Sequence, residues 1–148
     1  MRLVVQRVSR ASVRVNRITV AEIGPGLLVL VGVGVDDETW EAGWLARKVH
    51  ELRIFEDEDG KMNRSLRDVG GEVLVVPQFT LYGDASKGRR PSWAKAAPPD
   101  LARDRVETFA VALEARGSRV RRGAFREHME VELVNDGPVT LILEARPA

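Results

Sequence analysis

An unbroken apolar run from Gly26 to Val35, "GLLVLVGVGV", constrains the fold of this chain more than any other feature. The run is too short to cross a bilayer, which takes about 20 apolar residues. It also lacks the polar alternation of a strand with one face in water, so it predicts a strand buried on both faces. The stretch "GEVLVVPQFTL", residues 71–81, predicts a second buried strand with a proline inside it. The fold must therefore cover both sides of a sheet.

Two helices are expected to pack against this sheet. Asp36 or Asp37 is placed to cap the first helix, which runs to about Leu52, and Asp100 is placed to cap the second, which Gly117 ends. Apolar residues recur at helical spacing in both segments. These stripes are Trp44, Leu45, Val49 and Leu52 in the first helix, and Ala102, Val106, Phe109, Ala110 and Leu113 in the second.

The remaining segments favour strands. Residues 11–23 alternate around Asn16-Arg17, which predicts a β-hairpin, and "RIFED" predicts a strand before an acidic turn. Further strands are expected around Val120, at 129–134 and at 139–143. Between the last two lies "NDGPVT", residues 135–140, whose composition is typical of a hairpin turn. The order of elements predicts a mixed α/β, sheet-rich single domain over residues 1–148, with β/β/α layers and two main helices on one side.

One detail of that turn needs a reason. Pro138 directly follows Gly137. Asn, Asp and Gly alone would turn the chain, and a proline cannot donate a backbone hydrogen bond to a strand ladder.

Composition excludes several classes of function. The chain has no cysteine, so it has no disulfide, thiolate metal site or cysteine nucleophile. Its two histidines, His50 and His128, lack the spacing of metal ligands, so neither a metal nor another cofactor is expected. The basic N-terminus has no extended apolar stretch, which argues against a secretory signal and favours a cytoplasmic location.

Positive charge is clustered although the net charge is only +1. The segments "KGRRPSW" (87–93) and "RVRRGAFR" (119–126) are basic, and they contain the aromatic residues Trp93 and Phe125. A single basic run is more often solvated surface. Two runs with aromatic neighbours favour a nucleic-acid contact.

Catalytic motifs are sparse. No G-x-S-x-G elbow or recognisable triad order is present. Thr80 is expected at a strand exit before the long loop 82–99, where catalytic groups tend to gather, but it can equally serve only to satisfy the backbone. His50 or His128 could act as a general base, although a lone histidine is more often structural. Gly32 and Gly34 lack the rest of a nucleotide-binding fingerprint and favour close packing of strands.

Six segments in order carry a resemblance: "QRVSRASV", "GLLVLVGV", "LRIFEDEDGKMN", "VVPQFTLYGD", "KGRRPSW" and "NDGPVT". Along essentially the whole chain they resemble the D-aminoacyl-tRNA deacylase family, whose fold is then expected here. The resemblance implies hydrolysis of the ester that joins a D-amino acid to the 3′-terminal ribose of tRNA, and also action on glycyl-tRNA. It implies a homodimer with tRNA as its substrate, an active site at the dimer interface, and no cofactor, membrane or DNA partner.

The resemblance also assigns roles to residues. Gln78, Phe79 and Thr80 match the catalytic stretch, in which backbone N–H groups near Phe79 and Thr80 stabilise the oxyanion and no side chain acts as nucleophile. Gly137-Pro138, with a cis peptide bond in the family, enters the pocket of the other subunit and rejects L-aminoacyl groups. Arg7 matches an orienting arginine. Phe125 and Met129 match positions that line the pocket for the terminal adenosine.

Two departures from the family pattern leave alternatives open. Pro77 stands where the family has serine, and residues 126–128 are more charged than is usual there. A non-enzymatic tRNA-binding module with a degenerate site is therefore the second hypothesis. A general small-molecule esterase is the third, although the missing elbow and triad argue against it.

Overall fold

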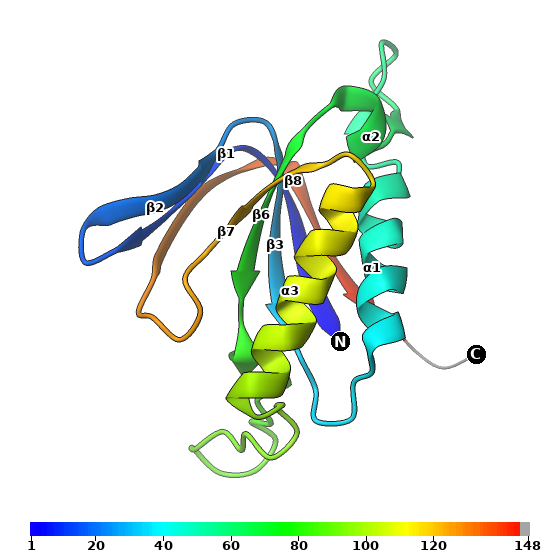
Figure 1. Cartoon of the computed structure of the whole chain (residues 1–148). Helices are drawn as coiled ribbons and strands as arrows, with labels where there is room; N and C mark the ends of the chain where they lie inside the picture. Colours follow the sequence, from blue (N-terminus) through cyan, green and yellow to red (C-terminus); the bar gives the residue numbers. More distant parts are fainter. Residues whose placement is uncertain (146–148) are drawn as a thin grey trace.

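The computed structural model describes residues 1–145, so the last three residues of the expected domain, 146–148, lie outside the described residues. The apolar run forms β3 (Gly26–Gly32), which is buried at every residue except Leu30. On one side β3 pairs antiparallel with β1 (Arg2–Val15). On the other it pairs parallel with β6 (Glu72–Pro77), and β7 (Arg119–Arg122) continues the sheet parallel to β6 (Figure 1).

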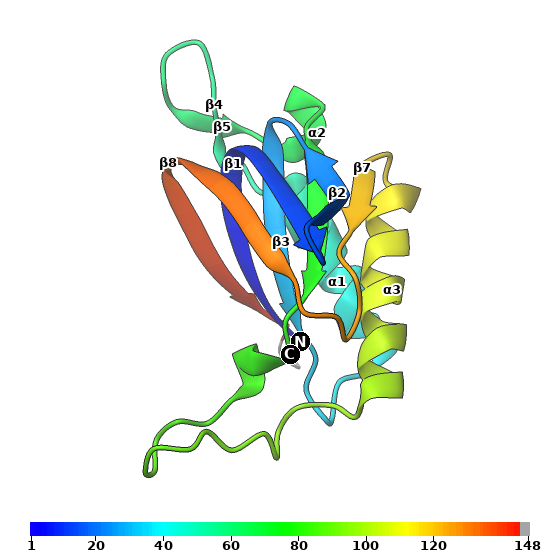
Figure 2. The same cartoon turned by 90° about the vertical axis from the view of Figure 1, so that its left-hand side faces the viewer.

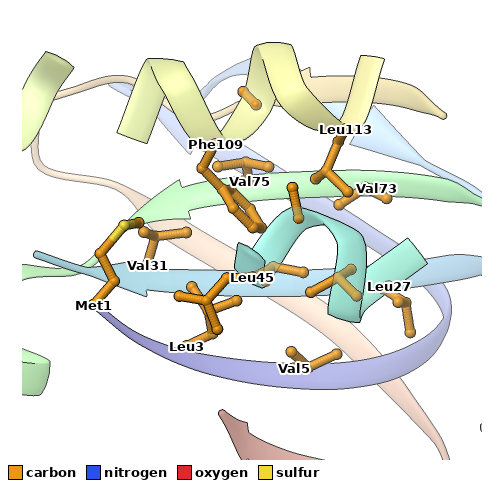
Figure 3. Packing of buried hydrophobic residues seen from close by; sticks show 14 of the residues in the cluster. Met1, Leu3, Val5, Leu27, Val31, Leu45, Val73, Val75, Phe109 and Leu113 are labelled. Atoms are coloured by element: carbon orange, nitrogen blue, oxygen red, sulfur yellow. The ribbon is translucent and has the colours of Figure 1, made fainter. Parts of the chain in front are cut away.

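Helices α1 (Thr39–Glu51) and α3 (Pro99–Ala115) cover one face of this sheet. Their apolar stripes meet the inward residues of the strands in the larger core cluster. Figure 3 shows Leu45 of α1 and Phe109 of α3 packed between the helices and the sheet. This is the helical layer that the periodicity predicts.

Three details of the helices differ from the prediction. The cap of α1 is Glu38, in a capping box with Glu41, and neither Asp36 nor Asp37 has this role. The Asp37 carboxylate instead accepts a hydrogen bond from the N–H of Gly34 at 2.6 Å. Trp44 is 44% exposed and so lies outside the core stripe. Helix α3 begins at Pro99, which leaves Asp100 inside its first turn instead of at the cap.

Curled strands cover the opposite face of the sheet. The far half of β1, its hairpin partner β2 (Ile18–Ile23) and the first half of β8 (Glu130–Glu144) bend across β3 and β6. Figure 2 shows β8 and α3 on opposite sides of the sheet. A second apolar cluster fills this interface: Val8, Ala11, Val13, Ala21, Ile23, Leu28, Leu74 and Val76. The expected β/β/α layering follows.

The segment 129–143 is not a hairpin, which corrects the prediction. Residues 130–144 form one strand, β8, that pairs antiparallel with β1 both before and after residues 136–139. "NDGPVT" is an irregularity inside that strand. Likewise, residues 71–81 are not one strand: β6 ends at Pro77, and Phe79–Tyr82 form the short 3-10 helix η1.

Short elements complete the described chain. They are the strands β4 (Phe55–Glu56) and β5 (Met62–Arg64) and the one-turn helix α2 (Leu66–Val69), of which only β4 was predicted. Among the described residues, no helix is both long and apolar enough to cross a membrane.

A substitution pair tests the packing of β3. A Cβ added at Gly26 would overlap the backbone carbonyl of Glu72 on the neighbouring strand, and it would lie 2.7 Å from the Glu72 nitrogen. Gly26→Ala should therefore lower the free energy of unfolding by about 3 kcal/mol or more, because two backbones must separate. Gly43 lies in the middle of α1 with no atom within 4 Å of an added Cβ. Gly43→Ala should stabilise by about 0.5–1 kcal/mol. Urea unfolding measures both, and equal effects of the two substitutions would contradict the close approach of β3 and β6.

Candidate functional site

A cavity of about 640 Å³ lies beyond the carboxyl ends of the parallel strands β3, β6 and β7. Ligand sites in sheets with parallel strands typically occupy this position, and the volume suits a small molecule. The inner wall is apolar and comes from the strand ends, the loop before α3 and the first turns of α3: Val31, Val33, Val76, Ala97, Ala102 and Val106. Polar and aromatic groups gather at the rim: Gln78, Phe79, Trp93, Arg126, Glu127 and His128.

Helix η1 forms one side of the rim. Pro77 ends β6, and the N–H of Gln78 then donates to the carbonyl oxygen of Val31 at 2.8 Å. The first N–H groups of a helix have no partner within it. The N–H groups of Phe79 and Thr80 are therefore available as donors where the cavity begins.

Close packing fixes the position of η1. A Cβ at Gly32 would lie 2.8 Å from Leu81, and a Cβ at Gly34 would lie 2.9 Å from the ring of Tyr82. The close approach at these glycines is thus against η1 and not against a strand, which corrects the prediction. Arg2 adds a hydrogen bond from Nη1 to the Leu81 carbonyl at 2.6 Å and stacks 4.9 Å from the centre of the Tyr82 ring.

Tyr82 of η1 and His50 of α1 have shifted pKa values, but neither residue lines the cavity. Burial, and then the charge of Asp37, raise the pKa of Tyr82 to about 12, so its phenol stays protonated. His50 lies away from the cavity, buried and 3.2 Å from the Ser118 hydroxyl. Burial, and then Arg116, lower the pKa of His50. Its role is structural, whereas His128 is exposed at the rim.

Two of the three predicted catalytic residues line the cavity. Gln78 and Phe79 do so, whereas Thr80 follows them on η1 outside the lining, with an exposed side chain. The Gln78 amide donates to the Thr80 hydroxyl. Among the described residues that line the cavity, none is serine, threonine, cysteine or lysine. The site therefore offers backbone donors and no hydroxyl, thiol or amine nucleophile, and its carboxylate and imidazole are those of Glu127 and His128 at the rim.

The segment after β7 forms the opposite wall. Phe125 and Met129 both line the cavity, as the resemblance implies. Arg103 of α3 stacks 4.9 Å from the centre of the Phe125 ring and holds it in place. Arg126 next to it has a positive φ of 63°, and unusual backbone of this kind in a residue other than glycine tends to occur at functional sites.

The remaining predicted residues form a separate cluster on β1 and β8. Val8 pairs with Asn135 and Gln6 pairs with Thr140, so Arg7 alone lies opposite residues 136–139. These four residues bulge out of the ladder, and we refer to them as the bulge. Gly137 has a φ of 129° and its bond to Pro138 is cis.

Buried polar contacts hold the bulge. Arg7 is 5% exposed; its Nη1 donates to the carbonyl of Ile54 at 2.9 Å, and its Nε donates to that of Asp136 at 3.1 Å. The side-chain amide of Asn135 donates to the carbonyls of Arg7 at 3.0 Å and Val139 at 3.1 Å. In the sequence, Asn135 belongs to the expected turn and to a segment of the family pattern, but neither assigns it this locking role.

A single chain does not bring the two clusters together. None of residues 135–140 lines the cavity, and neither does Arg7. Within residues 1–145 there is also no group of three or more histidine and acidic side chains arranged to hold a metal ion.

Comparison with known proteins identifies the family. The family model described as D-Tyr-tRNA(Tyr) deacylase matches residues 4–144. A D-aminoacyl-tRNA deacylase of Thermotoga petrophila is 59% identical, covering 98% of this chain and 97% of the relative. One of Thermomicrobium roseum is 60% identical, covering 98% of this chain and 94% of the relative.

Two solved structures share the fold. A c-Myc DNA unwinding element binding protein superposes with a TM-score of 0.92 at 39% identity, covering 99% of this chain and 100% of the other. A probable eukaryotic D-amino acid tRNA deacylase superposes with a TM-score of 0.78 at 21% identity, covering 97% of this chain and 98% of the other. The family match over nearly the whole chain and the close identity to its curated members have one consequence: this chain belongs to the D-aminoacyl-tRNA deacylase family.

Proposed function

We propose that the chain hydrolyses the ester bond of D-aminoacyl-tRNA and releases the free D-amino acid and tRNA. Family membership supports this substrate. The single structural observation that carries the proposal is a cavity with an apolar inner wall that opens onto free backbone donors and has no serine, threonine, cysteine or lysine in its lining. The terminal adenosine would occupy the cavity between Phe125 and Met129, with its ester at η1.

The chemistry requires little from side chains. An aminoacyl ester is already activated, so water can attack its carbonyl carbon while the bond to the ribose oxygen breaks and that oxygen takes up a proton. The ribose 2′-OH next to the ester would assist the attack. The N–H groups of Phe79 and Thr80 would stabilise the oxyanion, and one such donor contributes about 3–4 kcal/mol, roughly 10²- to 10³-fold in rate. Pro77 is compatible with this scheme because it removes a side-chain hydroxyl but leaves those two N–H groups.

The same proposal assigns chiral selection to the bulge of a second subunit. Arg7 and Asn135 fix the bulge, and residues 136–138 are exposed. A wall of backbone cannot rotate aside, so it would exclude an L side chain while leaving room for a D side chain or glycine. Glycyl-tRNA would then also be accepted.

A homodimer follows from this arrangement, because the bulge lies outside the cavity of its own chain. Strand β8 supports pairing between chains. Among the described residues it pairs only with β1, and Ile142 on it is 69% exposed. A strand of 15 residues with one free edge and exposed apolar side chains is a ready surface for association.

A second candidate is a nucleic-acid-binding module without activity, and one observation favours it. The loop 83–98 carries several exposed basic residues, and the protein at 39% identity is described as binding DNA. Turnover separates the two candidates, because a binding module would leave the ester intact.

Paired substrates test the proposed function. The purified protein should hydrolyse a D-aminoacyl-tRNA and spare its L-form, because only the D side chain fits beside a backbone wall. The measurement is kcat/KM for both forms of one aminoacyl-tRNA, with the spontaneous hydrolysis rate subtracted. Equal rates on the two forms would favour a general esterase, and no rate on either would favour the binding module.

Thr80→Ala tests whether catalysis depends on backbone. The substitution removes the hydroxyl that accepts from Gln78 but keeps the N–H. We expect kcat to fall less than about tenfold, whereas loss of a true nucleophile removes nearly all covalent catalysis. Single-turnover hydrolysis of a D-aminoacyl-tRNA is the measurement, and thermal unfolding confirms the fold. An inactive but folded variant would show that the Thr80 side chain takes part in the chemistry.

A further inference from the structure

The loop between η1 and α3 has an anchored tip. Asp84 and Ser92 exchange two backbone hydrogen bonds of 2.8 Å each, which close residues 85–91 into a tip. The Asp84 carboxylate also accepts from the N–H of Ser86 at 2.9 Å. The next residue, Trp93, lines the cavity and packs edge to face on Phe79 with ring centres 5.1 Å apart. The tip is therefore fixed to the cavity rim.

The tip is strongly basic. Lys87, Arg89 and Arg90 are all exposed, and no ion pair within residues 1–145 includes any of them. Asp84 is the one acidic residue in the sequence between Gly83 and Pro98, against four basic residues there. Other surface arginines are paired with acidic side chains, as with Arg122, which lies 3.0 Å from Glu107 and 2.6 Å from Glu114. The tip is thus a cluster of uncompensated cations beside the cavity.

The distance from the cavity limits what the tip can contact. Arg90 is three residues from Trp93, which is at most about 10 Å of extended chain. Stacked nucleotides of one strand repeat about every 3.4 Å. If the cavity holds the terminal nucleoside, the tip lies opposite the few nucleotides that precede it.

We propose that the guanidinium groups of Arg89 and Arg90, with Lys87, bind the phosphates of the unpaired 3′ nucleotides of tRNA immediately before the terminal one. This inference rests on the proposed function for the occupant of the cavity. It adds a phosphate-binding site outside the cavity that reads no base. Arginine suits this role because its planar fork donates two hydrogen bonds to one phosphate. The tip thereby contributes affinity for tRNA and leaves the chemical step to the cavity.

A charge-matched pair of double variants tests the site. Arg89→Gln with Arg90→Gln removes two cations from the tip. Arg67→Gln with Arg116→Gln is the control and removes two exposed cations far from the tip. The tip precedes α3 and Arg116 follows it, and this helix of 17 residues is about 25 Å long. Arg67 lies in α2, at the same end of the molecule as the end of α3 (Figure 1). Fluorescence anisotropy measures binding of deacylated tRNA to each protein over a series of salt concentrations. A second tRNA, with its unpaired 3′ nucleotides removed, serves as the truncated ligand.

The tip variant should bind intact tRNA more weakly than the wild type. Its plot of log affinity against log salt concentration should have a slope shallower by about 1.4, because each lost phosphate contact to a single strand reduces the slope by about 0.7. The control variant should keep the wild-type slope. Wild type and the tip variant should bind the truncated tRNA alike. The tip variant should also hydrolyse a D-aminoacyl ester of adenosine at the wild-type rate.

Other results overturn the site. A wild-type slope in the tip variant, an equal loss in the control variant, the same loss on truncated tRNA, or no binding of tRNA by the wild type would each do so. Failure of the proposed function has a different signature. In that case the wild type binds tRNA with the predicted dependence on Arg89 and Arg90 but leaves the D-aminoacyl ester intact.

Discussion

The buried guanidinium of Arg7 is the constraint on which the arrangement of β1, β8 and the bulge depends. A buried charge is costly unless it is paired and hydrogen-bonded. Arg7 meets this requirement only where two carbonyls, those of Ile54 and Asp136, converge on it, and the carboxylates of Asp136 and Glu56 lie nearby at 3.5 Å and 3.7 Å. The bulge must therefore sit opposite Arg7, and the chain before β4 must approach from the other side. Residues 136–138 face outward as a consequence.

The cavity is built by a different principle. Parallel pairing of β3, β6 and β7 brings three carboxyl ends to one edge, and the chain that follows each strand contributes a wall. Arg2 and the glycines at 32 and 34 then fix η1 so that its first N–H groups stand at the opening. In the proposed mechanism the backbone would supply the functional groups in both clusters, as N–H donors at η1 and as the rigid wall at the bulge. Such an enzyme would need few catalytic side chains, which fits a sequence without a recognisable catalytic motif.

Local patterns predicted the parts of the fold that depend on burial. The apolar run at β3 and the stripes containing Leu45 and Phe109 are buried as expected.

Predictions failed where a short segment suits two local structures and contacts from distant parts of the chain select one of them. Asn-Asp-Gly-Pro suits a hairpin or a bulge, and only the long-range register with β1 decides between them. For the cap of α1, local preference favours Asp36 or Asp37 over Glu38, but the Asp37 carboxylate is engaged by the Gly34 N–H. The cavity unites Phe79, Phe125 and Met129, which no spacing rule would group; the resemblance implied that grouping, and their roles stay proposals.

Subunit complementation tests the shared site most directly. Gly137→Ala would displace the bulge, because φ is 129° and the new Cβ would lie 2.9 Å from Arg7 Nη2. Ala97→Trp would fill the cavity. If each site takes its cavity from one subunit and its bulge from the other, both homodimers are inactive. A mixed dimer then has two different sites, and one of them combines the intact cavity of the Gly137→Ala subunit with the intact bulge of the Ala97→Trp subunit. After random exchange at equal amounts, half the dimers are mixed, so the mixture should regain about one quarter of the wild-type rate on D-aminoacyl-tRNA. Folded variants that demonstrably exchange subunits and still regain no activity would contradict a site shared between two chains.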